Sequence, residues 1–531
     1  MKKVLSVLQY TLLLVFLTCF QFTSYSQDKA PINFQESFDE LFLAVYQEKI
    51  FDNPKTFVDC VPLDHPDKIM NKYHEHKSNG SFDLKAFVGE NFDIPTTTQL
   101  EQQSVENRDI QQLQNQWSAI NPISSTQPYT GTYIHLPHPY VVAKGGGKDF
   151  YYWDAYSIAL GLHASNEVEM LRNIVKNCAW LIDQYGYVPE GNRTYYLGRT
   201  SPPFFSQMVN ELVYAEDSWG VLEEFLPQLQ AEYDFWMKGK ESLTETQPTN
   251  NRTVLMPNGA ILNRYYSENT QPRAEAYLHD TQLAERIHSV TNKPKAEICR
   301  EIQSACESGW AFSSRWLADN HTLESLETTS IVPVDLNSMI LQLEKLLGEA
   351  YWVAGDKDMA RYYHKLAVLR AKTINKYLWD KHADCYSDYH ILQNKPTRRF
   401  TIASMFPMYI GFATNMHSSH MAHHIKSLFM KHGGVATSLL NNGQTWDAPY
   451  GWAPMQWVTI VGLRNYQFDN IADEVKKRWV LFNLRAFQLN GTLPDKFNVE
   501  AFNTTIPSKY NHSRSAWTNA LLLKLLVEDG K

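Results

Sequence analysis

Five segments of this chain combine tryptophan or tyrosine with arginine, asparagine and carboxylate side chains. They are residues 145–156, 190–205, 273–280, 307–316 and 443–457. A sugar hydroxyl both donates and accepts hydrogen bonds, so carboxylates and arginine forks can bind it, while flat aromatic rings cover the apolar faces of a pyranose. Any one segment could be a structural corner. Five of the same composition favour a site for a neutral, hydroxyl-rich molecule.

The composition excludes several other kinds of partner. The 531 residues, 44% of them hydrophobic and 13% aromatic, suffice for one large core or two ordinary ones, although a large helical core uses aromatic residues as readily as a sugar site does. Lys and Arg number 49 against 57 Asp and Glu, and no basic run occurs, so nothing favours nucleic acid or an anionic membrane as a partner. We expect a monomer that binds a small molecule.

Cofactor and metal motifs are missing from the sequence. No GxGxxG, GxxxxGK[ST] or CxxC spacing occurs, which argues against Rossmann, P-loop and thiol-metal chemistry. The five cysteines after residue 26 are scattered and odd in number, so we expect no disulfide framework, and Cys299 and Cys306 could share one helix face as buried thiols. We assign no cofactor and no metal.

The N-terminus has the pattern of a signal peptide. Lys2 and Lys3 precede an apolar run over residues 12–20, and small residues at 24–26 predict cleavage after Ser26. The run is too short to span a bilayer comfortably, and no later segment approaches 18 uninterrupted apolar residues. We predict an exported protein, periplasmic or secreted, with no membrane span. Lipid anchoring at Cys19 is an alternative, although residues 16–18 make a poor lipoprotein box.

Helical periodicity dominates after residue 130. Between Asn337 and Trp352, apolar residues recur at i, i+3, i+7 and i+10, which places them on one stripe of a helix: Ile340, Leu343, Leu347 and Ala350. Asp335 or Asn337 is expected to cap its start, and Gly355-Asp356 to end it and cap a second helix over 357–378. Two helices joined so closely form an αα-hairpin.

Similar alternations of amphipathic helix and aromatic loop recur along the chain, over residues 156–185, 206–237, 274–306, 403–432, 452–489 and 515–528. The pattern predicts an all-α toroid of helical hairpins, with the loops that carry chemistry gathered at one mouth. Residues 27–130 are more polar, and we expect them to form an extension packed on the toroid of residues 131–531.

Longer motifs make the chain resemble one family. The similarity begins near Glu40-Leu41-Phe42, runs almost to the C-terminus, and is carried by residues 55–59, 151–156, 192–199 with Pro202-Pro203, 307–316, 329–337 and 445–454. On these motifs the chain is identified as a member of the periplasmic-type trehalases of glycoside hydrolase family 37. The resemblance implies an (α/α)6 barrel and inverting hydrolysis of α,α-trehalose to two glucose molecules.

Inversion requires two carboxyl groups about 6.5–9.5 Å apart, one to protonate the glycosidic oxygen and one to activate water. The family has its general-acid aspartate at the position of Ala311, and alanine has no proton to give. Its general base is a glutamate at the position of Asp495, which keeps a carboxylate but is one methylene shorter. Glu500 could compete for that role.

Other positions of the family site are also changed. A substrate-clasping arginine is lost within Gly145-Gly146-Gly147 or replaced by Lys148, an asparagine becomes Glu190, and a lid glutamate falls near Ser513. The resemblance implies that the remaining sugar-contacting positions are retained: Trp153, Asp154, Asn192, Arg199, Arg273, Glu275, Gly309, Trp446 and Asp447.

Two hypotheses follow. The chain is an active glycosidase with altered chemistry or specificity, in which Glu190 or another carboxylate supplies the proton, or it is a non-catalytic protein that binds a disaccharide or glycan on a trehalase fold. In the plainer interpretation Glu190 only pairs with Arg193 or Arg199. One changed residue could be an engineered knockout, but several on a chain that keeps its signal peptide point to natural divergence. Loss of a general acid costs about two to four orders of magnitude in rate, so we predict weakened or lost trehalose hydrolysis.

Overall fold

The computed structural model describes residues 31–78, 80–95, 113, 117–121, 130–143, 147–502 and 515–528. The expected signal peptide with Cys19, as well as Gly145-Gly146 and Ser513, lies outside these ranges.

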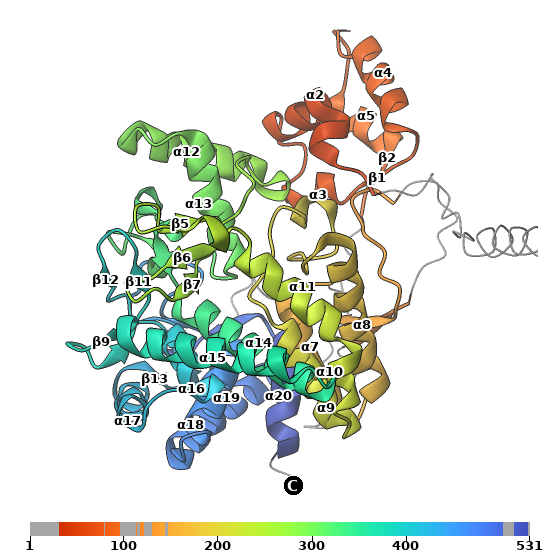
Figure 1. Ribbon diagram of the computed structural model, residues 1–531. Helices are drawn as coiled ribbons and strands as arrows, with labels where there is room; N and C mark the ends of the chain where they lie inside the picture. Colours follow the sequence, from red (N-terminus) through yellow and green to blue (C-terminus); the bar gives the residue numbers. More distant parts are fainter. Residues whose placement is uncertain are drawn as a thin grey trace, which may run out of the picture.

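Six of the described helices form a closed inner ring (Figure 1). In order around the ring they are α7 (Tyr152–Ala164), α9 (Phe205–Glu216), α14 (Val334–Val353), α16 (Phe406–Ile410), α18 (Ala453–Arg464) and α20 (Ala516–Val527). Each packs against the next, and α20 packs against α7, where Gly161 leaves room for Ala520. The predicted all-α toroid is confirmed, and the ring gives it the (α/α)6 architecture.

An outer layer covers this ring. It comprises α8 (Val168–Tyr185), α10 (Gly220–Glu224), α11 (Leu226–Met237), α15 (Lys357–Tyr377), α17 (Asn415–His424) and α19 (Asp469–Asn490). The inner helices lie between this layer and the centre, so residues on several of their faces are buried. In α7, ten of the eleven residues from Tyr152 to Leu162 are buried, and Asp154 is the one that is partly exposed.

The predicted αα-hairpin is α14 with α15, and its four-residue stripe is fully buried. Asp356 caps α15 as expected, accepting hydrogen bonds from the backbone N–H groups of Asp358 and Met359. The expected start of α14 is wrong, because the helix begins at Val334 and has no side-chain cap. The carboxylate of Asp335 binds Arg315 instead.

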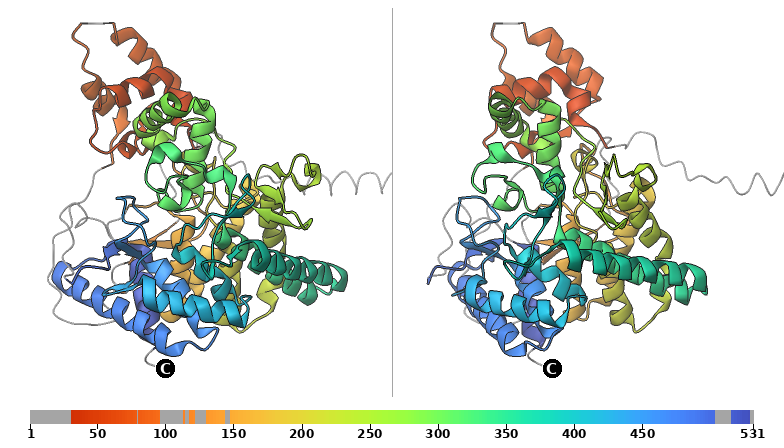
Figure 2. Two further views of the ribbon diagram at one scale, coloured as in Figure 1. Left: turned by 90° about the vertical axis from the view of Figure 1, so that its left-hand side faces the viewer. Right: turned by 60° about the vertical axis from the view of Figure 1, so that its left-hand side comes forward.

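The N-terminal residues form a small core of their own at one end of the molecule (Figures 1 and 2). It contains α2 (Phe34–Gln47), α3 (Lys55–Val58), α4 (Pro66–His76) and α5 (Leu84–Asn91), with β1 (Val61–Pro62) paired to β2 (Phe92–Asp93). Tyr46 donates a hydrogen bond of 2.8 Å to the carbonyl of Ala274, and Phe42 packs edge-on against Tyr277 at the start of α12 (Tyr277–Thr291). This unit therefore sits on the segment that leads into α12 and α13 (Lys295–Glu307).

Short antiparallel strands stiffen the loops between the helices. They are β3 (Trp117–Ile120) with β4 (Tyr140–Ala143); β5 (Thr249–Asn250), β6 (Thr253–Leu255) and β7 (Ile261–Asn263); β8 (Ile331–Val332), β11 (Tyr389–His390) and β12 (Lys395–Pro396); β9 (Trp379–Asp380) with β10 (Cys385–Tyr386); β13 (Met430–Lys431) with β14 (Gly434–Val435); and β15 (Tyr450–Trp452) with β16 (Lys496–Asn498). The five cysteines in the described ranges are buried free thiols. In the same ranges we find no helix both long and apolar enough to cross a membrane.

Candidate active site

The five aromatic and polar loops predicted from the sequence contact one another in a series that begins at the N-terminus of α7. The N–H of Tyr152 donates to the carbonyl of Glu190 at 3.0 Å, and the N–H of Phe150 donates to the side chain of Asn192 at 2.7 Å. From the same 190–205 segment, Arg199 forms an ion pair with Glu275 in the third loop. Three segments far apart in sequence thus meet.

The chain of contacts continues until it closes on α7. The ring of Phe312 stacks on His279 with centroids 6.3 Å apart, and its carbonyl accepts a hydrogen bond of 3.1 Å from the N–H of Trp446. Lys496, beside Asp495, donates to the carbonyl of Thr445 at 3.1 Å. Asp495 and Asp154 of α7 then line one cavity of about 170 Å³. The five predicted loops and the 494–498 segment therefore form one closed circle.

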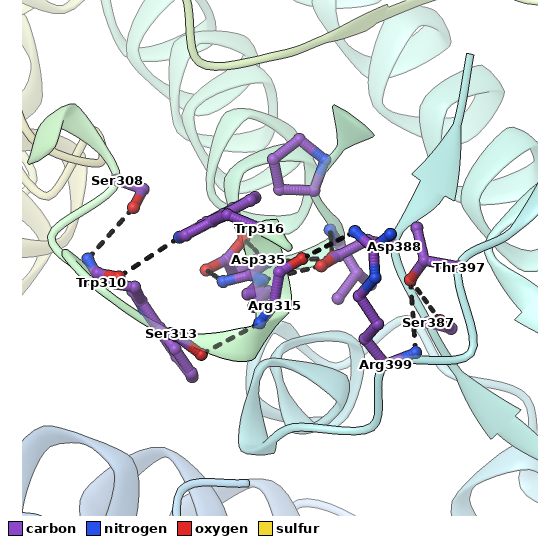
Figure 3. Close-up of polar contacts among 12 residues, drawn as sticks. Ser308, Trp310, Ser313, Arg315, Trp316, Asp335, Ser387, Asp388, Thr397 and Arg399 are labelled. Atoms are coloured by element: carbon purple, nitrogen blue, oxygen red, sulfur yellow. Dashed lines mark hydrogen bonds and ion pairs between the residues drawn. The ribbon is translucent and has the colours of Figure 1, made fainter. Parts of the chain in front are cut away.

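A buried ionic anchor fixes the 307–316 loop (Figure 3). Arg315, fully buried, makes two hydrogen bonds of 2.6 Å to Asp335 and two of 2.7 and 2.9 Å to Asp388. On the other side of Ala311, Ser308 Oγ accepts a hydrogen bond of 3.0 Å from the N–H of Trp310. Such bidentate pairs set orientation as well as adding energy. The backbone around residue 311 is therefore held from both sides.

Gly309 explains how tightly this loop meets α7. Its φ of 76° is left-handed, and a Cβ there would lie 1.6 Å from the ring of Trp153. Only glycine fits both the backbone conformation and the contact. Trp153 lies flat against Trp446 with ring centroids 5.6 Å apart. Ala311, half-buried, follows two residues later and presents a methyl group where the resemblance implies a carboxyl.

Tryptophan rings pack together beside this loop. Trp446 also stacks on Trp310 at 5.1 Å and on Trp452 at 4.0 Å, and Trp517 meets Trp452 edge-on at 5.4 Å. The indole nitrogens of Trp153, Trp310, Trp452 and Trp517 are buried and have no hydrogen-bond partner among the described residues. Buried polar groups normally have partners, so these four donors are exceptions within the described part of the chain.

Both carboxyl groups in the 170 Å³ cavity have raised pKa values. Burial, and then the negative charge of Asp495, raise the pKa of Asp154 to about 8. Burial also raises the pKa of Asp495, while a hydrogen bond from Ser515 and the charge of Lys496 offset part of that rise. At neutral pH, Asp154 therefore holds a proton that an ordinary aspartate has lost.

Arg199 is the centre of a second buried group of charges. Its guanidinium pairs with Glu190 and Glu275 and donates to the side chain of Gln303 at 3.2 Å. Burial raises the pKa of Glu190, and the positive charge of Arg199 opposes that rise. Oε2 of Glu275 is buried without a hydrogen-bond partner among the described residues. Of the two partners considered for Glu190, the structure shows Arg199, since Arg193 pairs with Asp149 and Asp59.

Three further residues predicted to contact the sugar form hydrogen bonds with other residues of the protein. Asn192 bridges Phe150 and Ile134, and Arg273 binds Asp280 in a bidentate pair that, against the effect of burial, lowers the pKa of that aspartate to about 2. Asp447 accepts hydrogen bonds from Ser313 Oγ at 2.8 Å and from the N–H and Oγ of Ser314 at 2.6 and 3.0 Å. These contacts position the loops, and a part in sugar binding stays a prediction for all three.

Lys148, the expected replacement for the substrate-clasping arginine, and Glu500, the expected competitor of Asp495, are both exposed. Glu500 lies 3.5 Å from Lys431, in an ion pair at the surface. Gln303 and Ser515 contact site carboxylates or Arg199, yet the sequence carries no signal for them beyond the expected helices, because neither belongs to an aromatic-rich loop.

Comparisons with known proteins agree with the architecture. The trehalase family model matches residues 49–530. A periplasmic trehalase of Escherichia coli O8 (strain IAI1) is 36% identical over 520 residues, which covers 96% of this chain and 90% of the relative, and one of Xanthomonas campestris pv. campestris (strain B100) is 38% identical over 465 residues, covering 88% and 81%. The solved structure of a neutral trehalase from Saccharomyces cerevisiae has the same fold, with a TM-score of 0.60 at 22% identity over 73% of each chain. The chain therefore belongs to the trehalase family of glycoside hydrolases.

Proposed function

We propose that this protein binds α,α-trehalose or a related disaccharide in the circle of loops and that its hydrolysis of that sugar is lost or strongly weakened. The observation that carries the proposal is Ala311: its loop is anchored as a reactive loop must be, yet the position offers a methyl group instead of a proton donor. In this proposal the catalytic positions are Asp495 and Ala311, with Glu190 as a candidate replacement acid.

Support for sugar binding comes from groups that lack partners within the protein. Four buried indole N–H donors and Oε2 of Glu275 have no hydrogen-bond partner in the described part of the chain. A ligand with several hydroxyl groups can satisfy both donors and acceptors. The five loops that meet in this circle also combine aromatic, arginine, asparagine and carboxylate side chains, a composition suited to recognise a pyranose even without catalysis.

The chemistry expected of Asp495 and Asp154 supports weak hydrolysis. An inverting pair must stand on opposite sides of the glycosidic bond. Asp495 and Asp154 line a cavity of about 170 Å³, which is smaller than the roughly 300 Å³ at which ligand pockets usually begin, so the space beside these carboxyl groups is narrow for a disaccharide. Asp495 keeps a carboxylate that can activate water, but its side chain is one methylene shorter than a glutamate, and a displacement of about 1 Å can lower the rate about a hundredfold.

The test is a panel of α,α-trehalose, other glucose disaccharides and glucose, with binding measured by calorimetry and cleavage by release of reducing sugar. Binding of a disaccharide with a cleavage rate at least about a thousandfold below that of an intact family member is the expected result. Ordinary turnover of trehalose would overturn the proposal. Absence of any binding would overturn the sugar site itself, and binding with no detectable cleavage would select the alternative of a non-catalytic disaccharide-binding protein.

A second candidate is an active glycosidase with a relocated proton donor, favoured by Asp154. Its pKa of about 8 keeps the carboxyl protonated at neutral pH, as a general acid requires. If it donates the proton, any residual cleavage disappears in Asp154→Asn and falls as the pH of the wild-type assay rises through 8. Glu190→Gln tests the other donor, and a rate that neither substitution changes would rule out both.

Location and domain division are also part of the proposal. The two bacterial relatives are named periplasmic trehalases. We extend that location to this chain, exported by a signal peptide that ends near Ser26. The separate N-terminal core supports an extension that ends near residue 130, with the toroid occupying the rest of the chain.

A further inference from the structure

A larger cavity, of about 570 Å³, opens beside the circle of loops. The end of α8 and the start of the following loop, Tyr185 to Tyr187, form one wall. Ala231, Asp234 and Phe235 of α11 also line the cavity, together with Lys238, which follows the last residue of that helix. Leu197-Gly198 and Glu268-Asn269 close the far side. Its volume falls within the range of about 300–1,000 Å³ that is usual for ligand sites. None of these lining residues is among the sugar-contacting positions predicted above.

The cavity has an aromatic wall. Tyr187 and Phe235 lie parallel, with ring centroids 4.4 Å apart and an interplanar angle of 20°, and Tyr185 lines the cavity next to them. All three side chains are only partly buried. Tyr187 is fixed by a hydrogen bond from its hydroxyl to the carbonyl of Leu197. Rigid, partly exposed rings of this kind offer flat faces to the C–H groups of a sugar ring.

Polar groups of both signs surround that wall. Lys238 and Glu268 pair at 2.9 Å across the rim, and Asp234 and Asn269 also line it. Arg252 lines the cavity although its side chain is almost fully buried, and its guanidinium lies 4.2 Å from the centroid of Phe235. The balance of charges favours a neutral ligand, because an anion would meet two carboxylates and a cation would meet Lys238 and Arg252.

Arg252 keeps donors for such a ligand. Its Nε and Nη2 hydrogen-bond the two carboxylate oxygens of Glu307 at 2.8 and 3.0 Å. Its Nη1 makes no hydrogen bond within the described part of the chain. Arginine presents five N–H donors in a planar fork, so donors on Nη1 are left for an oxygen atom in the cavity.

We propose that this cavity is a second carbohydrate site, which binds one pyranose ring of a neutral saccharide against the Tyr185 and Tyr187 part of the aromatic wall, with Arg252, Asn269 and Glu268 at the edge of the sugar, because Phe235 is covered by Tyr187 and by the Arg252 guanidinium. The site is separate from the one that the family chemistry uses. The ring stacks on the aromatic wall, Arg252 Nη1 donates to a sugar oxygen, and carboxylates at the rim accept from hydroxyl groups.

The second site adjoins the first through two segments. Gly198 lines the cavity, and the next residue, Arg199, pairs with Glu190 and Glu275 on the other side. Arg252 holds Glu307, the last residue of α13, which directly precedes the loop that carries Ala311. A saccharide bound to Arg252 therefore contacts the group that fixes the start of that loop.

The test is calorimetric titration of the purified protein with α,α-trehalose, maltose and glucose, comparing the wild type with Ala231→Trp. Ala231 lines the cavity from α11, so an indole at this position takes up part of the space that a sugar ring would occupy. Tyr214→Trp is the matched control, since Tyr214 is an exposed ring on α9 that does not line the cavity. Thermal unfolding checks that each variant is folded. Tyr185→Leu removes part of the aromatic wall and changes none of the contacts described above between the loops of the first site. Binding about two- to tenfold weaker is expected from the loss of one ring contact.

The number of sites separates the outcomes. The proposal is supported if Ala231→Trp has one binding site fewer than the wild type for at least one of these sugars while Tyr214→Trp keeps them all. It is overturned if the number is the same in Ala231→Trp and the wild type, or if the wild type binds none of the sugars. Should Ala231→Trp fail to fold, unchanged affinity in Tyr185→Leu overturns it instead. Failure of the first site alone leaves one site in the wild type and none in Ala231→Trp, which distinguishes the two proposals.

Discussion

Restoring a carboxyl group at residue 311 is the most direct test of why trehalose hydrolysis should be weak. The backbone there is fixed on both sides: the N–H of Trp310 donates to Ser308, and the carbonyl of Phe312 accepts from Trp446. Arg315 anchors the same loop to two buried aspartates. Ala311→Asp therefore places its carboxyl on a backbone that is already held in position.

The expected gain in rate can be worked from Ala311 and Asp495, the two catalytic positions of the proposed function. A general acid contributes about two to four orders of magnitude, so Ala311→Asp should raise kcat/KM for α,α-trehalose by about 10²- to 10⁴-fold. The shorter side chain of Asp495 leaves a deficit of about a hundredfold if its carboxylate is misplaced by about 1 Å. Ala311→Asp combined with Asp495→Glu should recover most of that remainder.

Glucose release from α,α-trehalose in a coupled assay measures these rates. Ala311→Asn is the matched control, because its side chain has the size and shape of aspartate but cannot act as the acid. The reasoning is refuted if Ala311→Asp and Ala311→Asn, both folded, hydrolyse trehalose at the same rate. A gain from Ala311→Asp without a further gain from Asp495→Glu would show that Asp495 already reaches the water.

Three further outcomes are expected. Gly309→Ala should lower the free energy of unfolding by about 2–5 kcal/mol, because the new methyl group meets both backbone strain and the Trp153 ring. Gly186→Ala is the control: Gly186 is also left-handed, at φ 82°, but has no atom within 4 Å, so the loss should be only about 1–2 kcal/mol. Equal losses of the two variants in urea unfolding would contradict the close contact between Gly309 and Trp153. Arg315→Lys should cost about 3–5 kcal/mol by the same measurement, because lysine cannot keep both buried bidentate pairs, and a cost below about 1 kcal/mol would disprove the anchor. Because folding raises the pKa of Asp154 from 3.8 to about 8, the stability linked to its proton is present below pH 3.8 and is lost as the pH rises to 8. The unfolding temperature of the wild type should therefore fall relative to that of Asp154→Asn between pH 3.8 and 8, and the two curves of unfolding temperature against pH should run parallel above pH 8. Curves that are parallel over the whole pH range would exclude the raised pKa.

Local sequence patterns predicted the helices well, but they did not predict where a tertiary contact changes the start of a helix. The stripe from Ile340 to Ala350 and the cap at Asp356 depend on neighbours in the chain, and both occur as predicted. The start of α14 does not, because Asp335 serves as a partner of Arg315, twenty residues earlier in the chain, rather than as a cap. A carboxylate in a capping position can be recruited by a distant cation, and no local pattern reveals that.

The candidate site was predictable as a set of loops but not as a set of contacts. Aromatic and polar composition identified segments that do meet in the structure. The pairing of Glu190 with Arg199 was one of two options open to sequence reasoning, which could not choose between them. The cavity shared by Asp154 and Asp495 depends on α20 packing against α7, which closes the ring with opposite ends of the toroid sequence. Such proximity follows from ring closure and has no local signature.

The Arg315 anchor separates two functions, positioning of the loop and proton donation, that belong to the same ten-residue segment, residues 307–316. Holding the loop falls to residues 313–316 and their buried aspartates, while proton donation would fall to residue 311 alone. Evolution can therefore erase the reaction by one substitution without endangering folding, because the anchor does not depend on the erased side chain. A single substitution can therefore turn an enzyme with such a loop into a sugar-binding protein. The same anchored backbone can also carry a new reactive side chain at residue 311 without other changes in the fold.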